Sequence, residues 1–174
     1  MRSAVRVLGP ALVVVAAVVA CQDRIGPATQ GTFNVTERFS AALTPAKENP
    51  PITDTATTSD TSLGTASAIV VDDTILILNV DIERVDTPTL AHIHTGNATT
   101  NGGVIVDIMV GTAATRNVAR FTGPYGDIQV VRSALRLRAV NFDSLLKLVR
   151  AGNAYVNVHS KRHPGGIIRA QLTP

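Results

Sequence analysis

Residues 65–82 read TASAIVVDDTILILNVDI and decide the fold class. The stretch holds two runs, Thr65–Val71 and Thr74–Ile82, that are rich in Ile, Val and Leu. Such residues are enriched in β-strands. Asp72-Asp73 lies between the runs and suits a tight turn. The stretch therefore predicts a β-hairpin.

Further strand signals lie on both sides of this hairpin. Upstream, Phe39, Ala41 and Leu43 alternate with small or polar residues, as in a half-buried strand. Downstream, four more segments have strand character: Pro88–Thr95, Val104–Val110, Ala154–His159 and Gly166–Leu172. The intervening segments are rich in turn residues and read as loops: Pro45–Asp60, Gly96–Gly103 and Ser160–Gly165.

One segment has helical rather than strand periodicity. Within Asn141–Gly152, apolar residues recur at helical spacing. Asn141 or Asp143 can cap its start, and Gly152 can end it in the left-handed conformation. We therefore predict a mainly β domain, an antiparallel β-sandwich or barrel-like fold with one short helix.

The N-terminal segment has the features of an export signal. Met1–Ala20 carries Arg2 and Arg6 before an apolar run that is too short to span a membrane. Residues 18–21 read Val-Val-Ala-Cys, which resembles the lipobox that lipoprotein-processing enzymes read. We therefore expect residues 1–20 to be a signal peptide and Cys21 to carry the lipid, whose two chains suffice for stable anchoring.

The mature chain is then one domain behind a short tether. Residues 21–32 are polar with Gly26, Pro27 and Gly31, which indicates a flexible tether, and residues 33–174 form the β domain. Fourteen basic and 13 acidic residues remain, so the sequence gives no sign of nucleic-acid binding. An acylated Cys21, the only cysteine, also leaves no thiol for a disulfide.

Histidines offer the clearest site for chemistry. His92 and His94 are two residues apart in a predicted strand and therefore project from the same face. His159 ends another strand, on the face that also carries Asn157. Three imidazoles can bind zinc or copper, with Asn157 orienting a ring from outside the ligand set. Strand-face histidines also commonly serve only as hydrogen-bonding residues, so both readings stay open.

Two motifs in order resemble the CHRD (chordin) domain family. The first is Ala91–Gly96 followed by Asn101–Val106, and the second is Gly152–Ser160 followed by Pro164–Leu172. The N-terminal strand and loop fit as well, so the resemblance covers roughly residues 39–172. It implies a β-rich fold and an exported protein, and it implies no particular biochemical activity.

The chain departs from the family pattern at three positions. Ile167 stands where the family usually has an acidic residue, and Ala170 stands where it usually has a glycine. His163 lies outside the pattern. The first two departures put in doubt any function that uses the acid near the last strand, while the fold is unaffected.

Two functions remain open for this sequence. The first is a non-catalytic binding or structural module of the cell envelope, anchored to a membrane by its lipid and facing an unknown protein or envelope ligand. No cofactor is required for that role. The second is a domain that binds one zinc or copper ion at His92, His94 and His159, with or without enzymatic activity. Gln22 after the lipidated cysteine favours the outer membrane, where the host has one.

Overall fold

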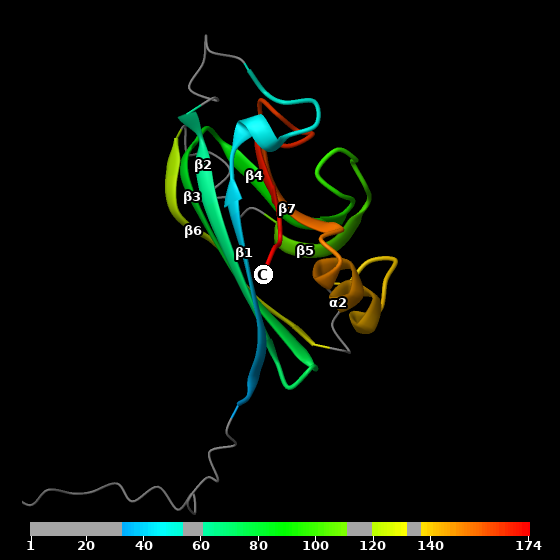
Figure 1. Cartoon of the computed structure of the whole chain (residues 1–174). Coiled ribbons are helices and arrows are strands. Elements are labelled where there is room, and N and C mark those ends of the chain that lie inside the picture. The colour runs from blue at the N-terminus through cyan, green and yellow to red at the C-terminus, as the bar shows by residue number, and fades with distance from the viewer. Residues whose placement is uncertain (1–32, 54–60, 111–119, 132–136) are drawn as a thin grey trace, which may run out of the picture. The chain divides into compact units, whose positions relative to one another are not determined.

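A computed structural model describes residues 33–53, 61–110, 120–131 and 137–174. The predicted signal peptide, the tether and Cys21 lie outside these residues. Within them, the chain forms two four-stranded antiparallel sheets and one short α-helix, which confirms the predicted β-sandwich (Figure 1). No helix in these four ranges has the length and apolar character needed to cross a membrane.

The first sheet contains the predicted hairpin of residues 65–82. Its strand order is β1-β2-β3-β6, with bounds Val35–Leu43, Leu63–Val71, Ile75–Val85 and Phe121–Val131. At the β2–β3 turn, Thr74 N–H donates to Val71 O at 3.0 Å, and Asp72 and Asp73 both have positive φ. Turns with two positive φ angles match the right-handed twist of paired strands.

The second sheet carries the histidines. Its order is β5-β4-β7-β8, with bounds Val104–Val110, Pro88–Thr95, Ala154–Ser160 and Ile168–Gln171. The central strands β4 and β7 each place alternate side chains in the core between the sheets: Ala91 and Ile93 from β4, Val156 and Val158 from β7. The intervening residues therefore face outward, away from the other sheet.

The two sheets are also joined along one edge. Ser40 in β1 pairs with Thr173, just past the end of β8, through hydrogen bonds of 2.7 and 3.0 Å. Thr44, just past the end of β1, pairs with Arg169 through bonds of 3.2 and 3.3 Å. Between these two isolated bridges, Ala42 O accepts a hydrogen bond from Lys47 Nζ at 2.6 Å. We call this edge the β1–β8 seam.

The helix α2 spans Phe142–Arg150 and lies beside β7 (Figure 1). Asn141 caps its start, because its side chain accepts a hydrogen bond from Ser144 N at 2.9 Å. Gly152 follows its end with a φ of +67°. The apolar face of α2 is buried in the common core through Phe142, Leu145, Leu146 and Val149.

One strand was not expected from the sequence. Strand β6 contains Gly123, Pro124 and Gly126, which weaken any strand pattern. The structure accommodates these residues with two register shifts against β3, one between Val80 and Asp81 and one between Ile82 and Val85. A short 3-10 turn, η1 (Pro45–Lys47), also lies within the segment predicted as a loop.

Leu145 tests the packing of the helix. Its side chain is fully buried, so Leu145→Ala removes apolar contacts and leaves a cavity. We expect a loss of about 2–5 kcal/mol in the free energy of unfolding, measured by urea denaturation. Leu148→Ala, at a half-buried position of the same helix, is the control and should cost less. A loss under roughly 0.5 kcal/mol for Leu145→Ala would contradict this packing.

Candidate functional site

The register of β4 against β7 brings the three predicted histidines together. His92 faces Asn157 across the ladder, His94 faces Tyr155, and Leu90 faces His159. His92 is therefore the diagonal neighbour of His159 on the outward face of the sheet. All three histidines are nevertheless buried, with 6–8% of their surface exposed. We call them the histidine cluster.

The rings of the histidine cluster lie in mutual contact. Their centroids are 4.9 Å apart for His92 and His159, 5.5 Å for His92 and His94, and 5.6 Å for His94 and His159. Each residue offers one nitrogen such that the three nitrogens lie within 4.8 Å of one another. His92 Nδ1 and His159 Nε2 are 3.0 Å apart. Two nitrogens on a tetrahedral zinc ion are separated by about 3.3 Å, so this pair is already close to the required spacing, and His94 lies near enough to complete the set after a small adjustment.

Backbone carbonyls fix the orientation of two rings. His94 Nδ1 is 3.0 Å from Gly102 O, and His159 Nδ1 is 2.9 Å from Pro164 O. Because a carbonyl only accepts, both Nδ1 atoms carry the proton and donate it. In a neutral ring, Nε2 then presents its lone pair. His94 Nε2 is buried and has no hydrogen-bond partner among the described residues.

The surroundings keep these rings uncharged. Burial, together with the charges of His159 and His94, lowers the pKa of His92 to about 4 against the opposing effect of Asp107. Burial also lowers the pKa of His94 and that of His159, although the bonds to Gly102 and Pro164 oppose it. Neutral imidazole is the form that binds metal ions.

Two glycines let the orienting loops approach the sheet. A Cβ on Gly102 would lie 1.9 Å from Thr95 O, so no other residue fits there without moving the backbone. Gly166 follows the turn that carries Pro164 and has a φ of +137°; its Cβ would lie 2.4 Å from the amide nitrogen of Asn157. Both positions therefore require glycine.

A buried stack supports the cluster from one side. The Tyr155 ring lies parallel to the His94 ring, with centroids 5.1 Å apart and planes at 9°. The guanidinium carbon of Arg169 lies 3.5 Å from the Tyr155 centroid. Arg169 also donates to Asn97 O, Thr100 O and Asn101 Oδ1 at 2.6–2.9 Å. These neutral oxygens of the 96–103 loop satisfy N–H donors of the buried guanidinium, and the bonds hold the loop against the sheet.

The structure adds a residue that the sequence reading missed. Asp107 on β5 faces His92 directly, and its Oδ1 lies 3.6 Å from His92 Nε2. Arg138 donates to Asp107 Oδ2 from Nε and pairs with it through Nη2, both at 2.6 Å. The sequence did contain a signal for this residue, because Asp107 is the only charged residue in the otherwise apolar run Val104–Val110.

Asn157 does not orient a ring as the sequence suggested. Its amide nitrogen donates to Gly165 O at 3.4 Å, and its Oδ1 has no hydrogen-bond partner among the described residues. Backbone carbonyls perform that role, and no side-chain pattern could have predicted them. His163 is not part of the cluster; its backbone closes the turn between β7 and β8, where its O accepts from Ser160 N and Gly166 N.

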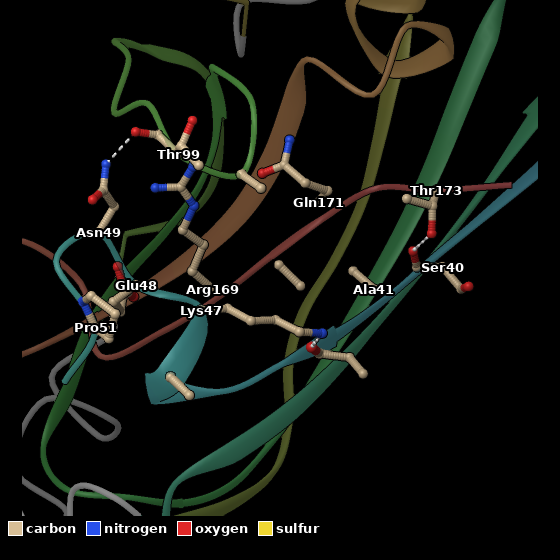
Figure 2. A pocket seen from close by; sticks show the side chains of 14 residues that line it. Ser40, Ala41, Lys47, Glu48, Asn49, Pro51, Thr99, Arg169, Gln171 and Thr173 are labelled. Carbon is tan, nitrogen blue, oxygen red and sulfur yellow. Dashed lines mark hydrogen bonds between the residues drawn. The ribbon is translucent and has the colours of Figure 1, made fainter. Parts of the chain in front are cut away.

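A separate cavity of about 600 Å³ opens at the β1–β8 seam (Figure 2). Small and polar residues line it, including Ala42, Ala170 and Gln171 from the seam itself. Glu48 and Arg169 lie side by side at one end of it (Figure 2). The family departure at Ala170 thus falls in this cavity, whereas Ile167 is buried in the apolar core.

Glu48 has an unusual environment for a carboxyl group. Only 8% of its surface is exposed, and its Oε1 has no hydrogen-bond partner among the described residues. Burial raises the pKa of Glu48 to about 7, although the nearby positive charge of Arg169 opposes the rise. Burial of this group therefore costs free energy once it ionises.

This cost predicts how stability depends on pH. The folded pKa of Glu48 is about 7 and its ordinary value is 4.5, so its contribution is fully present below pH 4.5 and is lost as the pH rises through 7. Glu48→Gln removes the ionisation. Urea denaturation should show the variant gaining up to roughly 3 kcal/mol over the native protein between pH 4.5 and pH 8. A difference that stays constant over this range would refute the assignment.

Comparison with known proteins gives one result. The profile of the CHRD domain matches residues 39–172, which include every strand of both sheets except the first residues of β1. No curated protein and no solved structure matches the sequence significantly. The match covers well over half of the chain and includes the whole histidine cluster, so the chain belongs to the CHRD domain family.

Proposed function

We propose that this CHRD domain is a non-catalytic metal-binding module of the cell envelope, which holds one zinc or copper ion at His92, His94 and His159. A lipid on Cys21 would anchor it to a membrane surface, preferentially the outer membrane. The observation that carries the metal assignment is the convergence of three imidazole nitrogens within 4.8 Å on buried strand positions.

The cost of burial supports this role. Three histidines occupy buried positions on adjacent strands, where their polar nitrogens are largely removed from water. The lone pair of His94 Nε2 lacks a partner among the described residues, and such a group costs about 1–3 kcal/mol. A metal ion bound to this nitrogen would offset that cost.

The ligand set also fits the proposed ions. Zinc and copper both accept imidazole nitrogen, and three protein ligands leave a fourth position for water or a partner's group. The hydrogen bonds from His94 and His159 to carbonyls are of the kind that orient metal-binding histidines. This arrangement favours a partner in the cell envelope that supplies the fourth ligand to the ion.

Metal titration tests the proposal. The tag-free protein should bind zinc or copper with 1:1 stoichiometry, measured by competition with a chromogenic chelator. His94→Ala removes a ligand and should weaken binding at least about 100-fold, more than the loss of an outer-shell partner. His163→Ala, which removes a histidine outside the cluster, is the matched control and should bind like the native protein. Equal metal affinity of the native protein and His94→Ala would contradict the metal site and show that the histidine cluster has only a structural role.

Fatty-acid labelling tests the anchor separately. Cells that make the native chain in the presence of a radioactive fatty acid should yield a labelled protein in the membrane fraction. Cys21→Ser removes the acylated sulfur, so that variant should stay unlabelled and be either unprocessed or released. Equal labelling of both chains would exclude a lipid on Cys21, whatever the outcome of the metal titration.

A further inference from the structure

Asp107 and Arg138 form an ion pair beside His92 of the histidine cluster. Asp107 lies opposite His92 in the β4–β5 ladder, between two register shifts in which β5 carries an extra residue. Its side chain is 18% exposed, compared with 58% for Arg138. The carboxylate therefore faces His92 from a sheltered position, while Arg138 covers it on the solvent side.

The hydrogen bonds around His92 define which of its ring nitrogens carries the proton. His159 donates its Nδ1 proton to Pro164 O, so in the neutral ring its Nε2 is an acceptor. The 3.0 Å contact between His92 Nδ1 and His159 Nε2 then requires the proton to lie on His92 Nδ1. Neutral His92 consequently presents a lone pair at Nε2.

That lone pair faces the carboxylate. His92 Nε2 and Asp107 Oδ1 are 3.6 Å apart, which is longer than a hydrogen bond. In this tautomer His92 Nε2 and Asp107 Oδ1 are both acceptors, so no hydrogen bond can form between them. The long separation agrees with that tautomer. The contact between His92 Nε2 and Asp107 Oδ1 is therefore not a hydrogen bond in this tautomer.

Metal binding at the cluster requires the other tautomer. His92 Nδ1 is the nitrogen that faces His159, and it can bind an ion only after its proton has left to solvent. A proton taken up from solvent at Nε2 keeps the ring neutral. The new N–H then faces Asp107 Oδ1, and a charge-assisted bond forms if the two groups approach by less than about 1 Å.

We infer that Asp107 is the positioning residue of the metal centre: it accepts the Nε2 proton of His92 and thereby selects the tautomer whose Nδ1 binds the ion. This inference rests on the proposed metal function and extends it to a residue outside the ligand set. The carboxylate contributes to affinity only in the metal-bound state, because only there does Nε2 carry a proton. Arg138 is paired with the other carboxylate oxygen and holds the side chain of Asp107 beside His92.

Asp107→Asn separates this role from a structural one. The amide can donate a hydrogen to the Nε2 lone pair of the metal-free tautomer, which keeps the proton on Nδ1 and opposes metal binding. We expect zinc affinity, measured by chelator competition on the tag-free protein, to fall about 10–100-fold, while the thermal midpoint of the metal-free variant stays near that of the native protein. Glu37→Ala breaks a carboxylate–arginine pair on the other sheet and should leave zinc affinity unchanged.

Nitrogen-15 NMR of the imidazole rings gives a second readout. Zinc should move the His92 proton from Nδ1 to Nε2 in the native protein, while His94 and His159 keep theirs on Nδ1. Tight zinc binding that is unaffected by Asp107→Asn, or a zinc-bound His92 that retains its Nδ1 proton, would overturn the role of Asp107 and leave the metal site standing. Absence of zinc and copper binding in the native protein would overturn both.

Discussion

The pairing of β4 with β7 is the constraint on which the remaining features depend. This central ladder sets Ala91 and Ile93 beside Val156 and Val158 in the core. Because side chains alternate along a strand, the same register sets the histidines on the opposite face. A slip by one residue would turn imidazoles into the core and apolar side chains outward. Core packing therefore fixes the relative positions of His92, His94 and His159 at the same time.

Two loops convert this outward face into a buried site. The 96–103 loop and the turn after β7 cover the face, and each supplies one carbonyl to a histidine. Arg169 binds the first loop through three acceptors and stacks on Tyr155. The second comes close because Gly166 has no side chain. The site thus owes its rigidity to backbone atoms and glycines as much as to its histidines.

The sequence predicted the fold class and the shared face of His92 and His94, because both follow from short-range periodicity, whereas the approach of His159 depends on the pairing of β4 with β7. The spacing of His92 and His94 guaranteed a shared face, and the family motifs placed His159 in a strand. What the sequence could not predict depends on pairing between distant segments. Asp107 opposes His92 only because β5 carries extra residues at its bulges, and Pro164 orients His159 through a carbonyl that every residue type has. Strand β6 escaped prediction because its glycines and proline conceal the pattern that its pairing with β3 imposes.

The attachments of β1 have a mechanical consequence. This strand is the first element after the predicted tether, and it bonds to β2 along its length and to residues at both ends of β8. Hydrogen bonds in antiparallel sheets run perpendicular to the strands. A force applied along β1 would therefore load these bonds together in shear and not break them one after another. The histidine strands β4 and β7 lie beyond β8 in the second sheet, so such a force would meet the bonds of β1 first.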